Sequence, residues 1–172
     1  MVKSCLSTSK KISQLLPVAL MGVGLSAAVS LPAVANDVVY HGNFCAPNRS
    51  SINMIERNQR GVQNTSNGST ASVQCPFDLP FNASLRVNRV EAIVYDRNPN
   101  ANVSCTLTGV GIDGNTLWSN TSSSSGSGAT YKVLSFSPPS MFIATMNMVC
   151  SIPPATSSGV SHVTIYRVIT TP

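Results

Sequence analysis

The sequence contains few charged residues and few aromatic ones. Of its 172 residues, 10% are charged and 6% are aromatic, with a single tryptophan. The formal net charge of +5 overstates how basic the folded part is, because Lys3, Lys10 and Lys11 all precede a long apolar stretch near the amino terminus. From Asn36 onward the net charge is only +2. So small a charge argues against a nucleic-acid-binding surface, and we expect no nucleic-acid partner.

The amino-terminal segment has the composition of a secretory signal peptide. An apolar stretch from Ile12 to about Leu31 follows the lysines, and residues 32–35, Pro-Ala-Val-Ala, place small residues where signal peptidase reads the chain. We predict cleavage after Ala35, which leaves one domain of 137 residues, 36–172. No later apolar run reaches the roughly 18 residues that a transmembrane helix needs. The mature protein is expected to be secreted, or periplasmic if its host is a Gram-negative bacterium that retains it there.

The mature region lacks residues suited to a helix surface. It holds 20 Ser, 12 Thr and 15 Asn, and Ser, Thr and Asn side chains compete with helical hydrogen bonds. Apolar and polar residues alternate over short runs, most strongly over 162–169, and a break in this alternation at Asn88 and Arg89 indicates a β-bulge. We predict an all-β antiparallel sandwich, jelly-roll-like, with eight or nine strands.

Two segments are harder to assign. Residues 50–57, SSINMIER, fit one or two turns of helix as well as they fit an irregular segment. Residues 119–130, SNTSSSSGSGAT, are of low complexity. They separate strand candidates at 116–119 and 132–136, so we predict a hairpin loop.

Four cysteines remain after the predicted cleavage, at Cys45, Cys75, Cys105 and Cys150. Four cysteines in an exported chain imply two disulfides. Cys105 and Cys150 each lie in the middle of a strand candidate, on its inward-facing set, so we favour a Cys105–Cys150 bridge. Cys45–Cys75 then follows, although the other two pairings remain open.

One loop has the side chains of a calcium site. Asp96, Asn98 and Asn100 place oxygen atoms at alternate positions, as Ca²⁺ ligands require. The EF-hand pattern fails, because Ala101 stands where glycine is needed and Leu107 where the bidentate glutamate belongs. Asn and Asp side chains also form ordinary turns by bonding their own backbone. We favour a turn, keep calcium as the alternative and expect no other cofactor.

Two aromatic residues are candidates for ligand binding. Trp118 and Tyr131 flank the serine-rich segment, where they could stack on a sugar ring. A large aromatic side chain can equally well cap a β-sheet core. Neither His41 nor His162 lies in a nucleophile motif, and no motif marks a carboxylate pair of the kind a glycosidase uses. We therefore predict that the protein is not an enzyme.

Short motifs in a fixed order span most of the mature chain. They are Gly42-x-x-Cys45, Val73-x-Cys75-Pro76, Asp96-Arg97-Asn98 with Val103-x-Cys105-x-Leu107, and Cys150-x-Ile152-Pro153. In this order the chain resembles small secreted bacterial proteins with four cysteines and no assigned function. The resemblance implies a two-disulfide β-sandwich and supplies no catalytic residues.

The function predicted from these features is that of a non-enzymatic extracellular protein, structural or adhesive, that acts through its surface. If the strong carboxy-terminal run lies at a sheet edge, the protein could self-associate by strand pairing. The alternative is a carbohydrate-binding module that uses Trp118 and neighbouring polar residues to bind a glycan. A small secreted hydrolase ranks third.

Overall fold

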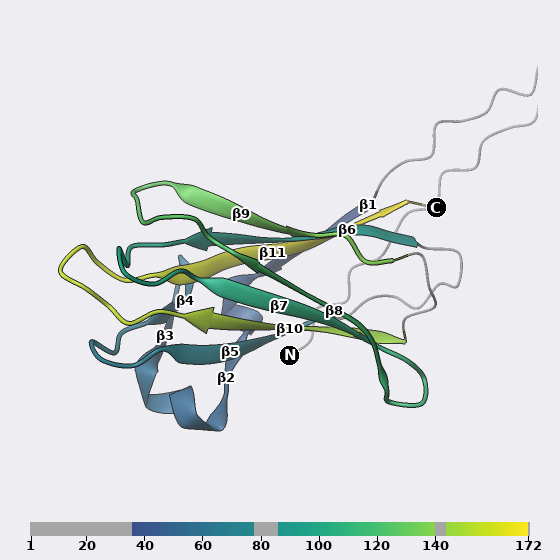
Figure 1. Cartoon of the computed structure of the whole chain (residues 1–172), viewed down its shortest axis with the longest axis horizontal. Coiled ribbons are helices and arrows are strands. Elements are labelled where there is room, and N and C mark those ends of the chain that lie inside the picture. The colour runs from purple at the N-terminus through teal and green to yellow at the C-terminus, as the bar shows by residue number, and fades with distance from the viewer. Residues whose placement is uncertain (1–35, 78–85, 140–143, 172) are drawn as a thin grey trace, which may run out of the picture. The chain divides into compact units, whose positions relative to one another are not determined.

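The computed structural model describes residues 36–77, 86–139 and 144–171, so the predicted signal peptide lies outside the described residues. The described residues form two antiparallel sheets packed as a β-sandwich (Figure 1), which confirms the predicted fold class. Within these residues no helix has the length and apolar character needed to cross a membrane.

Sheet A has the strand order β3-β4-β11-β6-β9, and β1 also pairs with β11. Its strands are β1 (Asn36–His41), β3 (Ile55–Asn58), β4 (Gly61–Asn64), β6 (Arg86–Tyr95), β9 (Tyr131–Phe136) and β11 (His162–Thr171). Sheet B has the order β2-β5-β10-β7-β8. Its strands are β2 (Ala46–Pro47), β5 (Ala71–Pro76), β7 (Ser104–Val110), β8 (Thr116–Ser123) and β10 (Thr145–Ile152).

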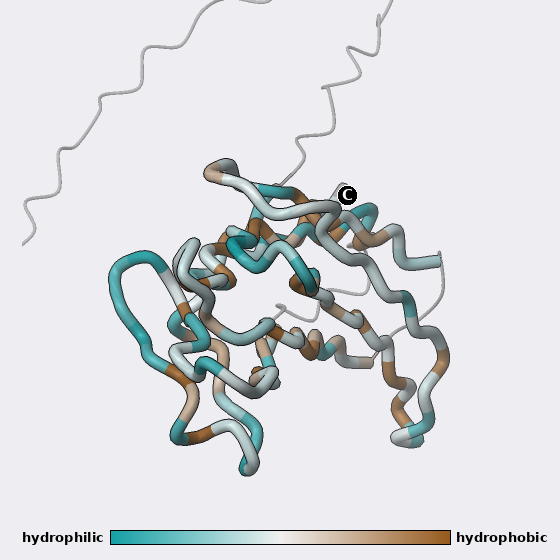
Figure 2. The backbone as a smooth tube through the Cα atoms, turned by 60° about the vertical axis from the view of Figure 1, so that its left-hand side comes forward, coloured by the Kyte–Doolittle hydropathy of each residue, from teal (hydrophilic) through white to brown (hydrophobic). Residues whose placement is uncertain are grey.

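Alternation along the strands builds the core between the sheets. In β10, Met146, Met148, Cys150 and Ile152 are buried, while the residues between them are partly or fully exposed. This is the pattern of a strand with one face on the core and one toward solvent. Figure 2 shows the same feature along the tube, as short hydrophobic segments separated by pale or hydrophilic ones.

Both predicted disulfides are present. Cys105 on β7 lies directly opposite Cys150 on β10 and is bonded to it. Cys45, just before β2, is bonded to Cys75 on β5. The mid-strand, inward-facing placement inferred from the sequence is what brings Cys105 and Cys150 together.

The predicted number of strands is wrong, because the described residues contain eleven. The additional strands are the two-residue β2 and the hairpin of β3 and β4, which are too short for alternation to reveal. Gly61, with φ +120°, opens β4 in this hairpin, and a side chain there would collide with the carbonyl oxygen of Val163. The uncertain segment 50–57 contains the end of a 3-10 helix, η2 (Arg49–Met54), followed by β3.

The hairpin predicted around the serine-rich segment is also wrong. Strand β8 continues to Ser123, and β8 belongs to sheet B whereas β9 belongs to sheet A. The segment therefore crosses between sheets. The predicted bulge is confirmed, since the pairing of β6 with β11 skips Asn88.

The carboxy-terminal strand lies inside sheet A, not at its edge. β11 pairs with β6 along one side, and with β4 and β1 along the other. The proposed strand addition through residues 163–169 is therefore wrong, because the backbone groups of β11 already have partners. Self-association by another strand stays a prediction.

Candidate functional site

Three ring side chains meet on the outer face of sheet A, the face turned away from sheet B. His162 on β11 lies opposite Tyr95 on β6, and Tyr95 lies opposite Tyr131 on β9. Residues opposite each other in an antiparallel pair share a face. The neighbouring residues Val94 and Val163 belong to the core. Tyr95, Tyr131 and His162, here called the surface group, therefore point outward.

The rings of the surface group pack against one another, but one of them remains exposed to solvent. The ring centroids of Tyr95 and Tyr131 are 5.2 Å apart, and those of Tyr95 and His162 are 5.0 Å apart. His162 is only 3% exposed, beneath its neighbours, whereas Tyr131 is 56% exposed on an edge strand. Tyr131 thus offers an aromatic surface to solvent, held in place by the two rings behind it.

Burial controls the protonation of His162. Desolvation lowers the pKa of its imidazole below the ordinary value, and the positive charge of Arg60 lowers it further. The backbone of Val160 acts in the opposite direction, although neither ring nitrogen forms a hydrogen bond of good geometry within the described residues. The folded state therefore favours the neutral form of the imidazole.

Arg97 extends the surface group on the side of Tyr95. Its guanidinium carbon lies 5.7 Å from the centroid of the Tyr95 ring, a cation–π distance. Its Nε donates to the carbonyl oxygen of Ser158 at 2.6 Å, and its Nη1 donates to the Tyr95 hydroxyl at 3.4 Å. These contacts fix the guanidinium beside the rings.

A buried carboxylate anchors the loops around this group. The Asp96 side chain is fully buried. Its two oxygens accept hydrogen bonds from the hydroxyls of Ser124 (2.5 Å) and Ser161 (3.2 Å) and from the backbone N–H groups of Asn98 (3.1 Å) and Val103 (3.3 Å). The loops after β6, β8 and β10, which gather at one end of the sandwich (Figure 1), are therefore tied to one side chain.

The loop proposed for calcium uses its oxygens internally. The side-chain oxygen of Asn98 accepts from the backbone N–H groups of Asn100 (2.8 Å) and Ala101 (3.0 Å), as in an Asx turn. Within 36–77, 86–139 and 144–171, no group of three or more His, Cys, Asp or Glu side chains could hold a metal ion. The arrangement fits the turn that the sequence favours, and calcium at Asp96, Asn98 and Asn100 stays a prediction.

The two predicted sugar-binding aromatics do not come together. Trp118 lies on β8 in sheet B, opposite Gly109, and packs against the core. Tyr131 lies on the outer face of sheet A. The structure therefore gives Tyr131 the partners Tyr95 and His162, in place of Trp118.

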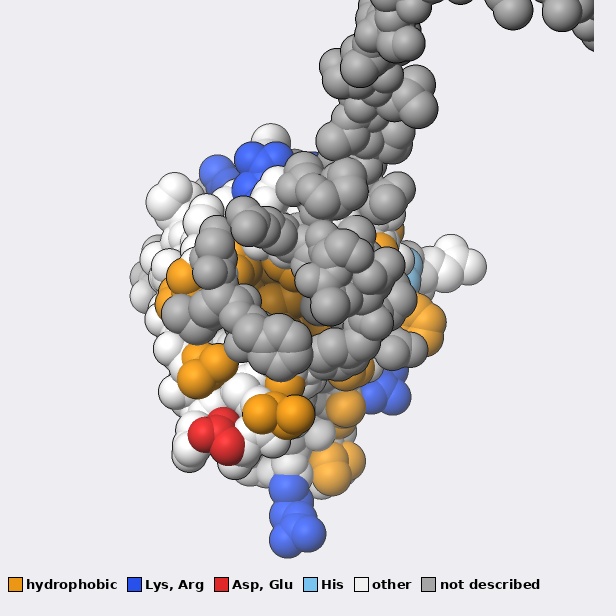
Figure 3. Space-filling view, turned by 90° about the vertical axis from the view of Figure 1, so that its right-hand side faces the viewer, with side chains coloured by type: hydrophobic (Ala, Val, Ile, Leu, Met, Phe, Trp, Pro, Cys, Tyr) orange, Lys and Arg blue, Asp and Glu red, His pale blue; other side chains and the backbone are white. Residues whose placement is uncertain are grey.

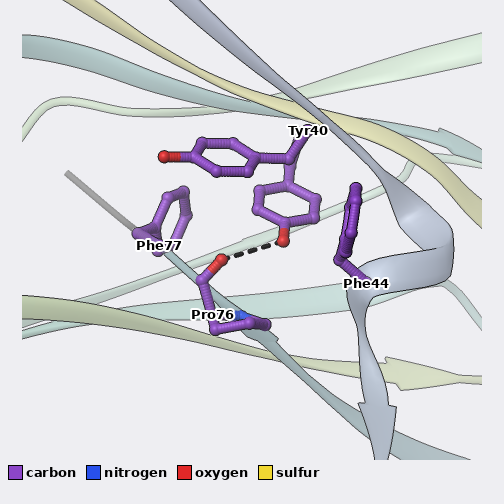
Figure 4. Close-up of a pocket in the computed structure, with 5 residues that line it drawn as sticks. Tyr40, Phe44, Pro76 and Phe77 are labelled. Atoms are coloured by element: carbon purple, nitrogen blue, oxygen red, sulfur yellow. Dashed lines mark hydrogen bonds between the residues drawn. The ribbon is translucent and has the colours of Figure 1, made fainter. Parts of the chain in front are cut away.

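A second set of aromatic residues lines a pocket. Tyr40, Phe44, Phe77 and Tyr166, here called the pocket group, surround a cavity of about 360 Å³ together with Pro76 (Figure 4). Tyr40 and Tyr166 stack with centroids 5.0 Å apart, and Phe77 meets both rings edge-on. Figure 3 shows hydrophobic side chains gathered on the face of the molecule at the right-hand side of Figure 1.

One of the two tyrosine hydroxyls in the pocket group is hydrogen-bonded within the protein. The Tyr166 hydroxyl donates to the carbonyl oxygen of Pro76 at 2.8 Å. Burial, followed by the neighbouring Tyr40, raises the pKa of Tyr166 to about 12. The described residues that line the pocket carry no charged side chain. The described lining is mostly aromatic, which suits an apolar body.

Sequence reasoning missed Tyr95, Arg97 and His162 as site residues. Tyr95 could have been assigned outward from the inward set of Val90, Ala92 and Val94. The contact between Tyr95 and His162 could not have been predicted in this way. His162 lies far from Tyr95 in the sequence, and only the register of β6 with β11 brings the two residues together.

No protein-family model matches this chain, and no curated protein matches it either. Solved structures give matches of low identity. One is a family 6 carbohydrate-binding module (18% identity, TM-score 0.44, covering 75% of this chain and 90% of that one). Another is a carbohydrate-binding module, CBM36, in complex with calcium and xylotriose (12% identity, TM-score 0.42, 75% and 97% covered). A third is an isomalto-dextranase of Arthrobacter globiformis T6 complexed with panose (16% identity, TM-score 0.47, 77% and 23% covered). Because every TM-score is below 0.5, we draw no conclusion about ligand or activity from these matches.

Proposed function

We propose that this protein is a non-enzymatic glycan-binding β-sandwich that takes a sugar ring on Tyr131 of the surface group. The observation that carries the proposal is the exposed Tyr131 ring, fixed from behind by Tyr95 and His162. An aromatic ring that is already ordered loses little conformational entropy when a flat apolar ligand face stacks on it.

Polar groups border this ring, as a sugar requires. The loop of residues 124–130 leads directly into Tyr131, and the backbone N–H of Gly128 donates to the Asp96 carbonyl oxygen at 3.0 Å. Exposed residues of this loop include Ser125, Ser127 and Thr130. Hydroxyl side chains beside an aromatic surface are suited to the hydroxyls of a sugar, which need hydrogen-bond partners when they leave water.

The expectation of export forms part of this proposal. Two disulfides fit a protein that acts in an oxidising compartment. A glycan-binding surface would account for the predicted adhesive role. The partner would then be a polysaccharide, and not a second copy of the protein paired through β11.

The test is a glycan array with the purified protein, followed by affinity measurements on the strongest hit. Tyr131→Ala is expected to weaken binding about tenfold or more, which corresponds to about 1.4 kcal/mol. Its matched control is Phe44→Ala, which removes an aromatic ring that is 66% exposed but belongs to the pocket group. This control should bind like the wild type.

Two results would overturn the proposal. If the array gave no hit, glycan binding itself would be wrong. If Phe44→Ala lost binding while Tyr131→Ala retained it, the sugar would occupy the pocket and the assignment to the surface group would be wrong. Trp118→Ala, checked for folding by circular dichroism, tests the other aromatic residue predicted from the sequence.

A further inference from the structure

We infer that the glycan bound by the surface group carries an acidic substituent, a carboxylate or a sulfate, and that Arg97 binds it. This inference rests on the proposed function and names the class of sugar. It starts from a property of Arg97 that Arg89 and Arg167, on the same face, do not share.

Among the residues that the structure describes, no carboxylate pairs with the guanidinium of Arg97, which is nevertheless ordered. The ion pairs formed between described residues join Arg89 and Arg167 to acidic side chains, and Arg97 is absent from them. On the same outer face, Arg167 donates to the buried carboxylate of Glu91 at 2.6 Å, and Arg89 lies 3.0 Å from it. Those two arginines have carboxylate partners, whereas Arg97 has none among the described residues.

The surrounding loop is shaped to hold Arg97. Its backbone N–H donates to the hydroxyl of Ser161 at 2.9 Å, and its Nε donates to Ser158. Gly159, with φ +121°, lies so close that a side chain there would be 3.4 Å from Nε. Fixing a long side chain costs conformational entropy. That cost is already met before any ligand arrives.

Several donors of Arg97 remain available. A guanidinium has five N–H donors, and two side-chain hydrogen bonds of Arg97 are formed, one through Nε and one through Nη1. The remaining N–H groups form the fork that matches the two oxygens of a carboxylate or sulfate. The adjacent acid, Asp96, faces the core and accepts four hydrogen bonds of its own, so it does not compete for this fork.

The other charges on this face bear on where along the row from Glu56 to Tyr131 an acidic group of the ligand would lie. Arg60 adds positive charge near His162, as the lowered pKa of His162 reflects. Glu56 lies on β3, across β4 and β11 from Tyr95, and accepts from Gln63 at 3.0 Å. Arg60 lies in the turn between β3 and β4, on the same side of His162 as Glu56, so these two charges oppose each other, and Arg97 over Tyr95 is the positive charge that favours an acidic group.

The test compares three probes of similar length by titration calorimetry: a neutral cello-oligosaccharide, an oligogalacturonate, and a sulfated carrageenan oligosaccharide. The wild type is expected to bind at least one acidic probe about tenfold or more tightly than the neutral one. This preference should shrink between about 0.1 M and 1 M salt, where the screening length falls from about 10 Å to 3 Å.

Arg97→Gln should remove the preference for the acidic probe, so that the variant binds the acidic and neutral probes with equal affinity. Arg97→Lys keeps the charge without the fork and should retain part of the preference. The matched control is Arg49→Gln, since Arg49 is exposed at the start of η2, away from the surface group.

Each alternative outcome is distinct. Equal affinity for neutral and acidic probes in the wild type would overturn this inference and leave the proposed function standing. A preference that survives Arg97→Gln would overturn the assignment to Arg97. Binding of none of the probes, together with an array without hits, would overturn the proposed function itself. A preference for one acidic probe over the other identifies carboxylate or sulfate as the group bound.

Discussion

The surface group and the pocket group contain similar side chains but differ in what those side chains still have to offer. Tyr166 of the pocket group is fully buried, and its hydroxyl donates to Pro76. Tyr131 of the surface group is 56% exposed, and Arg97, which lies over the Tyr95 ring, has no carboxylate partner among the described residues. We therefore assign the pocket group mainly to stability and propose the surface group as the place for a ligand. Aromatic content alone does not locate a site.

A single bulge separates the two groups. His162 and Tyr166 are four residues apart on β11, and in a regular strand such residues would share a face. The pairing with β6 shifts between Val163 and Ile165, so that Thr164 is an additional residue. His162 then points outward to Tyr95, while Tyr166 points inward to Tyr40 and Phe77.

The largest expected difference between the groups is in stability. Tyr166→Ala should lower the free energy of unfolding by about 3–5 kcal/mol, because it empties a buried aromatic site. Tyr131→Ala should lower it by less than about 1 kcal/mol, because over half of the ring is already exposed. Urea denaturation of the two variants measures both values. Equal losses would mean that Tyr131 is as much a part of the core as Tyr166.

The sequence predicted the architecture better than the site. Alternation identified most strands, the bulge at Asn88, and the inward positions that pair Cys105 with Cys150. All three can be inferred locally, because side chains along a β-strand alternate between its two faces every second residue. The bulge at Thr164 escaped notice, because Val163 and Thr164 both suit a strand and only pairing with β6 shows which residue is additional.

The site could not be predicted for a related reason. Nothing near Tyr131 in the sequence indicates that its partners are Tyr95 and His162, since these contacts depend on which strands are neighbours in sheet A. Trp118 was favoured for its size and its place beside a loop. In the structure it packs against the core from the edge strand of sheet B.

A smaller effect is expected from Tyr166→Phe, which removes only the hydroxyl. At neutral pH the loss of the hydrogen bond to Pro76 should cost about 0.5–1.5 kcal/mol. The pKa of Tyr166 is raised from 10.0 to about 12, so above pH 10 the unfolded state loses this proton while the folded state keeps it. The wild type should therefore lose stability between pH 10 and about 12, and its advantage over the variant should shrink. Urea denaturation across this range measures the gap, and a constant gap would contradict the burial assigned to this hydroxyl.

Below neutral pH, the titration of His162 should make the free energy of unfolding depend on pH. Its pKa lies below the ordinary 6.5. As the pH falls below 6.5, the unfolded state gains a proton that the folded state does not bind, so the free energy of unfolding decreases. The His162→Gln variant has no imidazole to titrate at this position, so its free energy of unfolding should change less with pH between pH 7 and about 5. Wild type and variant with the same slope would show that His162 is not shielded by Tyr95 and Tyr131.

The smallest expected effect concerns what holds the surface group in place. Asp96 lies between Tyr95 and Arg97 in the chain, and its carboxylate is engaged by four protein donors. Calcium takes six to eight oxygen ligands, so binding at Asp96 would require breaking these hydrogen bonds. We expect the melting temperature of the protein to be the same, within about 1 °C, in excess calcium and in excess chelator. A ligand at 100 times its dissociation constant adds about 2.7 kcal/mol to the free energy of unfolding, which would raise the melting temperature by several degrees. A rise of that size in calcium would contradict this expectation. It would mean that a bound ion, in addition to the internal hydrogen bonds of Asp96, stabilises the loops around the surface group.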